Sequence, residues 1–164
     1  MKHSFCLILV LCLLLTGCGI QVERFKEPVT FYYPYAEYRY FTGDGVIASE
    51  EREASGHRDD LSYLLALYLM GPADESLTAP LPRGTRIYAS SQTEDTIQLR
   101  LSDGASVLDD KAFSIACACL SLTCLDLTDA ESVTIESGER SATMTRDMLV
   151  LNDIATYSNT EDTK

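Results

Sequence analysis

The sequence is short of basic residues and of histidine, and it contains no tryptophan. Its 164 residues include 13 Lys and Arg against 25 Asp and Glu, which gives a formal net charge of −12. Because such a chain repels phosphate groups, we expect no nucleic-acid partner. Only two histidines occur, His3 and His57, and no set of Cys, Asp and Glu has the spacing of a metal site. We therefore expect no metal and no cofactor.

The first residues form an apolar segment that ends in a cysteine. Lys2 supplies a positive charge, and the apolar run over residues 5–15 is too short to span a membrane comfortably. Gly17 stands directly before Cys18. This order is similar to the lipobox of bacterial lipoproteins, which implies cleavage after Gly17 and acyl chains such as palmitate on the Cys18 thiol. The alternative is an uncleaved N-terminal membrane anchor with an incidental cysteine.

The lipobox resemblance divides the chain into four parts. Residues 1–17 are predicted to be a lipoprotein signal peptide, and residues 18–28 a short polar tether. Residues 29–151 are long enough to form one domain with its own core. Residues 152–164 are polar and are predicted to be a flexible tail. In this organisation the protein is anchored to the cell membrane through lipid on Cys18, on the extracytoplasmic face.

Three cysteines lie within the predicted domain, Cys117, Cys119 and Cys124. Their apolar surroundings indicate a helix, in which Cys117 and Cys124 are separated by about 10 Å along the axis. That separation is too long for a disulfide. No Cys-x2-Cys spacing is present either, so a zinc site is not expected. We interpret the three residues as buried free thiols.

The domain begins with an aromatic stretch. Residues 29–41 are rich in Tyr, Phe, Val and Thr, which favour strands, and turn residues at 42–45 lead into a second strand over 46–52. The two strands are predicted to form a β-hairpin. Residues 61–70 then place apolar side chains at helical spacing, and a Gly-Pro pair follows that is typical of a helix end.

The rest of the domain alternates strands with one more helix. Strands are predicted over residues 85–91, 96–101 and 132–137, a helix over 108–125, and a short edge strand over 147–151. The order of elements gives the fold class α+β, arranged as β-α-β-β-α-β in the split βαβ type. The helices are expected on one face of a mostly antiparallel sheet, with the N-terminal β-hairpin added to it.

Five short stretches carry a family resemblance. They are YLMGP at residues 68–72, PLPRGT at 80–85, LRLSD at 99–103, LSLTCLDL at 120–127 and SVTIESG at 132–138. In this order they resemble the GerMN domain of sporulation and germination lipoproteins. The resemblance implies a non-catalytic protein-interaction module with a fold similar to the ring-building motifs of secretion systems. The partners it implies are envelope or sporulation-complex proteins, with peptidoglycan as a further candidate.

The sequence departs from the family pattern in two respects. The family's namesake protein carries two such domains in tandem, and this chain has one. Residues 48–57 are longer and more charged than the pattern leads us to expect. We interpret the stretch over residues 71–84 as architecture rather than as an active loop, with Leu77 and Leu81 as its apolar anchors.

No residue set indicates catalysis. His57 stands near acidic residues, but a Ser-His-Asp triad also needs a nucleophile on a sharp turn and an oxyanion hole, so we interpret His57 as an exposed loop residue. Asp103, Asp109 and Asp110 fit helix capping better than calcium binding, because the EF-hand pattern is absent. A wall hydrolase would need a carboxylate pair, and none stands out. We expect no catalytic residue and no enzyme activity.

The aromatic stretch contains two sets of residues that alternate along the predicted strand. One set is Phe31, Tyr33 and Tyr35, and the other is Tyr32, Tyr38 and Tyr40. One set must face the core, and the other either packs within the protein or binds a partner or a sugar ring. The candidate binding surface is therefore Tyr32, Tyr38 and Tyr40. Protein interaction in envelope assembly is the main expectation, and binding of a small ligand or wall glycan on this aromatic face is the alternative.

Overall fold

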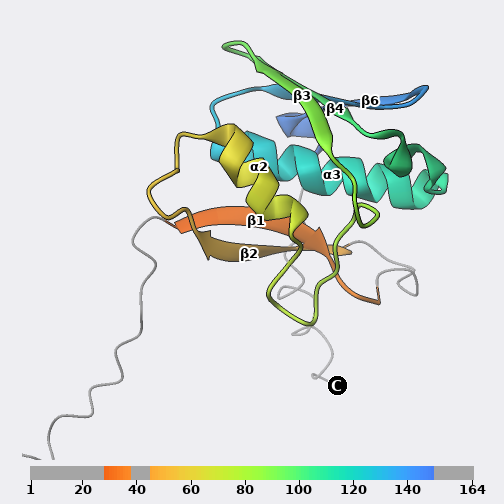
Figure 1. The fold of residues 1–164 in the computed structure, drawn as a ribbon, viewed down its shortest axis with the longest axis horizontal. Coiled ribbons are helices and arrows are strands. Elements are labelled where there is room, and N and C mark those ends of the chain that lie inside the picture. The colour runs from red at the N-terminus through yellow and green to blue at the C-terminus, as the bar shows by residue number, and fades with distance from the viewer. Residues whose placement is uncertain (1–27, 38–44, 150–164) are drawn as a thin grey trace, which may run out of the picture.

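The computed structural model describes residues 28–37 and 45–149 (Figure 1). The strands in these ranges are β1 (Pro28–Pro34), β2 (Ile47–Glu53), β3 (Ile87–Gln92), β4 (Thr96–Leu101), β5 (Ser132–Ser137) and β6 (Arg140–Thr145). The helices are α2 (Leu61–Leu69) and α3 (Asp110–Leu127). The predicted signal peptide, Cys18 and the predicted tail lie outside the described residues, as does the predicted tether except for Pro28.

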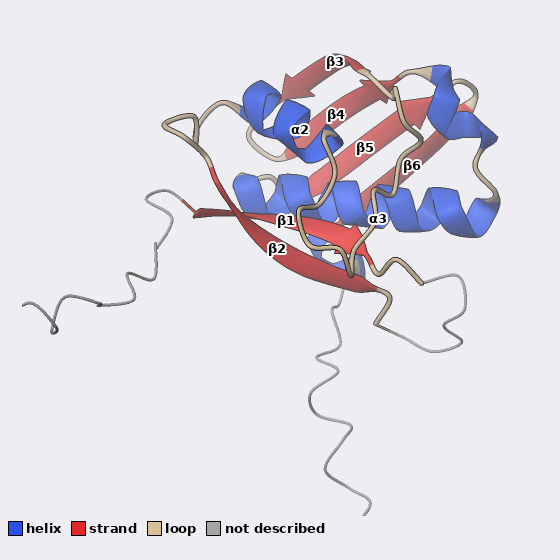
Figure 2. Cartoon of the chain, turned by 60° about the horizontal axis from the view of Figure 1, so that its bottom comes forward, coloured by secondary structure: helices blue, strands red, loops and turns tan. Residues whose placement is uncertain are grey.

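Two sheets pack on opposite sides of α3. Strands β3, β4, β5 and β6 form a four-stranded sheet in that order, and β1 and β2 form a separate two-stranded sheet. Helix α3 contacts β1 on one side and β5 and β6 on the other, and α2 lies on the same face of the four-stranded sheet as α3 (Figure 2). One hydrophobic cluster draws on both sheets and both helices.

The predicted α+β class is confirmed, with both helices on one face of a sheet in which two of the three pairings are antiparallel. The topology differs from the split βαβ type in two respects. Strands β4 and β5 are parallel and direct neighbours, so no strand separates them. The sheet also lacks the strand expected to precede α2, because β1 pairs with β2 in a sheet of its own. Strand β1 packs against α3 from the side opposite the larger sheet, and this position excludes β1 from that sheet.

Two predicted strands are wrong in extent. Strand β1 ends at Pro34, because the chain then turns and the Ala36 N–H donates to the Ser76 carbonyl at 2.8 Å. The strand predicted over 147–151 does not begin there, since Arg146–Met148 is a 3₁₀ helix, and residues 150 and 151 lie outside the described part. The last strand in the described ranges is β6, whose alternating Ser and Thr give little apolar signal.

Helix α2 begins and ends where the sequence predicts. The Asp60 carboxylate accepts the Tyr63 N–H at 3.0 Å and caps the first turn. Gly71 has a φ of 90°, the left-handed conformation that ends many helices. The buried residues of α2 are Leu64, Leu65 and Tyr68.

Helix α3 is buried on more than one face because it lies between the two sheets. Ten of its 18 residues are buried. The Asp109 carboxylate accepts the Ala112 N–H at 2.8 Å, which confirms the capping interpretation for Asp109. Cys117, Cys119 and Cys124 are free and buried, as predicted. Burial raises the pKa of the Cys117 thiol to about 11 and that of Cys124 to about 12, so both are protonated and poorly nucleophilic near neutral pH.

Candidate functional site

One side of the aromatic strand forms part of the core. Phe31 and Tyr33 are fully buried. The Tyr33 ring stacks on the Tyr68 ring of α2, with 4.8 Å between centroids and 6° between planes. The Tyr33 hydroxyl donates to the Tyr68 carbonyl at 3.0 Å. Burial raises the pKa of both phenols, so neither ionises near neutral pH. The prediction that one aromatic face is core is confirmed.

The other side of the strand is represented by Tyr32, which is half-buried rather than displayed on a surface. Its backbone N–H donates to the Thr123 hydroxyl oxygen of α3 at 3.0 Å. Burial, and next the negative charge of Asp126, raise the pKa of the Tyr32 phenol, and the charge of Arg146 acts in the opposite direction. A cavity of about 210 Å³ lies beside this ring, with walls from Leu122, Leu125, Asp126, Arg146 and Leu149.

The other two residues of the predicted aromatic surface, Tyr38 and Tyr40, lie outside the described residues. A surface made of Tyr32, Tyr38 and Tyr40 therefore stays a prediction. What the described residues add is that Tyr32 is partly enclosed by α3. Only part of its ring is left for a ligand.

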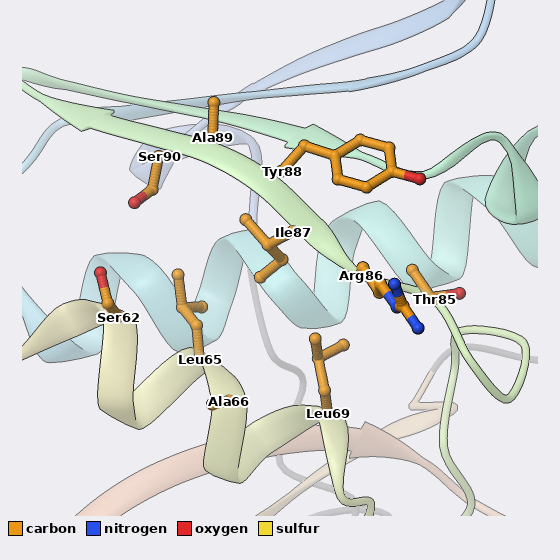
Figure 3. Close-up of a pocket in the computed structure, with 10 residues that line it drawn as sticks. All are labelled: Ser62, Leu65, Ala66, Leu69, Thr85, Arg86, Ile87, Tyr88, Ala89 and Ser90. Atoms are coloured by element: carbon orange, nitrogen blue, oxygen red, sulfur yellow. The ribbon is translucent and has the colours of Figure 1, made fainter.

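A second feature, which the sequence did not indicate, is a groove of about 540 Å³ between α2 and β3 (Figure 3). Leu65, Ala66 and Leu69 line it from α2, and Ile87 faces them from β3. Ser62 and Ser90 lie at one end, and Thr85 and Arg86 lie at the other. The middle of the groove is apolar, and its ends are polar.

Strand β3 is an edge strand. It pairs with β4 alone, and no described residue forms a hydrogen bond to its outer backbone edge. An irregularity between Ile87 and Ala89 interrupts the pairing, and Tyr88 within it is 66% exposed. Edge strands of this kind present unpaired N–H and C=O groups that another strand can use. The groove and the open edge are thus two parts of one surface.

The charge of the groove differs from that of the chain. Its lining contains Arg86 and no acidic residue, although the chain carries a formal net charge of −12. The backbone of Arg86 is fixed to Ser102, whose N–H donates to the Arg86 carbonyl at 2.8 Å. The Arg86 side chain is exposed and forms no ion pair within the described part of the chain. It is available to an anionic group.

Two charged residues of β2 hold the turn that follows α2. The Glu50 carboxylate accepts the N–H groups of Ala73 and Asp74 at 2.8 and 2.9 Å. Arg52 pairs with Glu50 at 3.0 Å and donates to the Gly71 carbonyl at 3.2 Å. These contacts give a physical reason for the charges in the unexpected stretch over residues 48–57. The side chains that alternate along β2 fasten the turn after α2.

The remaining candidates for chemistry are placed as follows. His57 is exposed, as predicted, and its ring stacks on Tyr63 with 4.2 Å between centroids. In the described ranges, no group of three or more His, Cys, Asp or Glu is placed to hold a metal ion. Neither of the two described α-helices has the length and apolar character needed to cross a membrane.

Comparison with known proteins identifies the fold. No protein-family model matches the sequence, and no curated protein matches it. Among solved structures, the chain is similar to the tandem GerMN domains of the sporulation protein GerM from Bacillus subtilis. That match has 14% sequence identity and a TM-score of 0.55, and it covers 83% of this chain and 51% of that chain. The chain has a GerMN-like fold.

A further similar structure is that of a candidate lipoprotein from Clostridium perfringens, at 17% identity and a TM-score of 0.47, covering 74% of this chain and 89% of that chain. This chain spans about half the length of the GerM structure, which contains GerMN domains in tandem. The GerMN resemblance of residues 68–138 is confirmed at the level of the fold.

In this GerMN-like fold, the Gly-Pro and Pro-x-Gly stretches are architectural. Leu77 and Leu81 are buried, which confirms their interpretation as anchors. Gly84 has a φ of 84°, in the left-handed region, just before the chain enters β3. The connection from α2 to β3 is therefore fixed at both ends and in the middle.

Proposed function

We propose that this protein is a lipid-anchored, extracytoplasmic and non-enzymatic protein whose GerMN-like domain binds another protein of the cell envelope, in assembly during sporulation or germination. The observation that carries the proposal is the apolar groove beside the open edge of β3. An open edge supplies backbone hydrogen bonds, and an apolar groove supplies buried area. Both are properties of a binding module.

Two further observations support the proposal. The stretch from Lys2 to Cys18 is similar to a lipobox, which supports a lipid anchor. Because the chain is acidic, it is repelled by anionic head groups, so attachment would rest on the acyl chains. The fold is similar to that of a protein described as a sporulation protein, which supports a role in sporulation or germination.

The test uses the full-length, tagged protein in its host. Cross-linking in sporulating cells, followed by purification from detergent-solubilised membranes, is expected to recover a defined envelope protein. The matched control is Cys18→Ala, which is expected to leave the membrane fraction or to persist as an uncleaved precursor. A deletion strain is expected to sporulate or germinate poorly. Recovery of no envelope partner, together with normal sporulation and germination of the deletion strain, would refute the proposal.

The alternative function, binding of a wall glycan or small ligand, has one specific observation in its favour. Tyr32 borders a cavity of about 210 Å³ that also contains a carboxylate and a guanidinium. Titration with purified muropeptides, followed by NMR, separates the two functions. Shift changes at Tyr32, Tyr38 and Tyr40 would favour the glycan, and unchanged spectra at millimolar muropeptide would rule it out.

A further inference from the structure

We infer that the groove between α2 and β3 binds an extended segment of a partner protein, which adds to the sheet at β3, points apolar side chains into the groove and places a carboxylate beside Arg86. This inference rests on the proposed protein-binding function, and it names the surface and the chemistry of the partner. Three features of the groove carry it: its backbone edge, its apolar middle and its single charge.

The backbone edge sets the conformation of the ligand. Strand β3 spans Ile87–Gln92, and its outer edge has no partner among the described residues. A segment that pairs with this edge must be extended, so its side chains alternate between the two faces of the sheet. One set then faces α2, and the other faces the solvent. The ligand is expected to be apolar at every second residue.

The middle of the groove selects those apolar residues. Leu65 and Leu69 of α2 point towards Ile87 of β3, and the side chains leave an open space between the two elements (Figure 3). Ala66 is exposed on the wall of α2, and its small size leaves room for an incoming side chain. Burial of apolar groups against these residues removes apolar surface from water and so favours binding.

The charge at one end gives the segment a polarity. Arg86 is exposed, has no ion-pair partner in the described part of the chain and is the only charged residue of the lining. Guanidinium groups bind carboxylates through two parallel hydrogen bonds. An Asp, a Glu or a terminal carboxylate at the matching end of the segment would satisfy it. A basic residue at that position would be repelled.

A second copy of this chain fits the groove less well. The β3 residues that share the groove side are Ile87, Ser90 and Gln92, which pair opposite the buried Leu101, Leu99 and Ile97 of β4. Pairing of two β3 edges would therefore place Ser and Gln in an apolar groove, where unpaired polar groups are costly. The net charge of −12 also opposes association of two copies.

The test screens a displayed library of random heptapeptides against the full-length protein in non-ionic detergent. The wild type is expected to enrich peptides that alternate apolar residues and end in an acidic residue. Ala66→Glu fills the groove and is expected to weaken the best peptide at least tenfold. Ala66 is exposed and Glu is a good helix former, so the fold is expected to persist, with an unchanged circular dichroism melt.

Two more variants complete the design. Ser141→Glu adds the same charge to the exposed side of β6, at the opposite edge of the sheet, and is expected to enrich the same peptides as the wild type. Arg86→Glu is expected to change the preferred end residue from acidic to basic while the apolar alternation remains. A merely structural role of Arg86 would not reverse this preference.

Four outcomes would overturn the inference. They are no enrichment by the wild type, equal binding of the best peptide by Ala66→Glu, enriched peptides without alternation, and a concentration-dependent dimer that Ala66→Glu abolishes, which would make a second copy the occupant. The cross-linking experiment separates these failures from those of the proposed function. If Ala66→Glu recovers the envelope partner at wild-type yield, the groove is not the site and the proposed function stands. If the wild type recovers none, the proposed function fails.

Discussion

Strands β1 and β3 both lie at the edge of a sheet, but the rest of the molecule covers β1 and leaves the outer edge of β3 open. Strand β1 is rich in aromatic residues, and α3 covers it so closely that the Tyr32 N–H donates to the Thr123 hydroxyl. Strand β3 has an undistinguished sequence, and its outer edge is open beside an apolar groove. The strand rich in aromatic residues is therefore the covered one in this protein, and the plainer strand is the accessible one.

Replacement of one aromatic residue on each strand is expected to give the largest difference in the free energy of unfolding. Phe31→Ala in β1 removes a fully buried ring and is expected to lower the free energy of unfolding by about 3–5 kcal/mol. Tyr88→Ala in β3 removes a ring that is 66% exposed and is expected to change it by less than about 0.5 kcal/mol. Urea denaturation measures both. Equal losses for the two variants would break the comparison.

Glu50→Gln tests how firmly β2 fixes the turn that follows α2. The carboxylate accepts two backbone N–H groups and pairs with Arg52, so its loss is expected to lower the free energy of unfolding by about 2 kcal/mol. Glu51→Gln, at the exposed neighbouring position, is the matched control and is expected to leave stability unchanged. If both variants behave alike in urea, the turn after α2 is held by other contacts.

The buried thiols of α3, the helix that covers β1, predict that the stability of the fold depends on pH. The pKa of Cys117 rises from 9.0 to about 11 on folding, so between these values the unfolded chain loses a proton that the folded chain keeps. The contribution of this thiol to the free energy of unfolding is therefore fully present below pH 9. Between the two pKa values it falls by about 1.4 kcal/mol per pH unit.

Urea denaturation at pH 7, 9, 10 and 11 measures this fall. Cys117→Ala is expected to reduce the slope of this fall, because one titrating thiol is removed, while the other buried thiols and the buried tyrosines continue to contribute. A slope that is the same in the variant and in the wild type would contradict the assignment to Cys117.

Replacement of two hydroxyl-bearing residues of α3 is expected to give the smallest difference in the free energy of unfolding. Thr123→Val leaves the Tyr32 N–H without its acceptor and is expected to lower the free energy of unfolding by about 1 kcal/mol. Ser121 is also buried, but its hydroxyl has no hydrogen-bond partner among the described residues, so Ser121→Ala is expected to be neutral or slightly stabilising. Hydrogen exchange at Tyr32 is expected to accelerate in Thr123→Val alone. Opposite ranking of the two variants would mean that α3 does not close the edge of β1.

Local features of the fold could be predicted from the sequence. Gly71 marks the end of α2, Asp60 marks its start, and Leu77 and Leu81 anchor the following connection. Each depends on residues a few positions apart, where capping and turn geometry dominate. The free, buried cysteines were predictable for the same reason, since helical spacing alone keeps Cys117 and Cys124 apart.

Features that join distant segments could not be predicted. The order of strands in the sheet, and hence the open edge of β3, depends on which surfaces pack together rather than on any local pattern. The groove needs α2 and β3 to meet, and the contact from Glu50 to Ala73 spans 23 residues. Strand β6 was missed because its alternation is Ser and Thr against Ala and Met, which resembles a loop in sequence.

The position of α3 between the two sheets has a consequence for how the chain folds. Tyr32 and its acceptor Thr123 are 91 residues apart, so the aromatic strand is synthesised long before the helix that covers it. Such distant contacts form slowly, because the loop between them must close first. Until α3 arrives, Phe31 and Tyr33 lack the cover they have in the finished protein. Strand β1 is thus the first of the described strands to be made, yet it gains its cover only after α3 is made, and the aggregation of incomplete chains is expected to begin there.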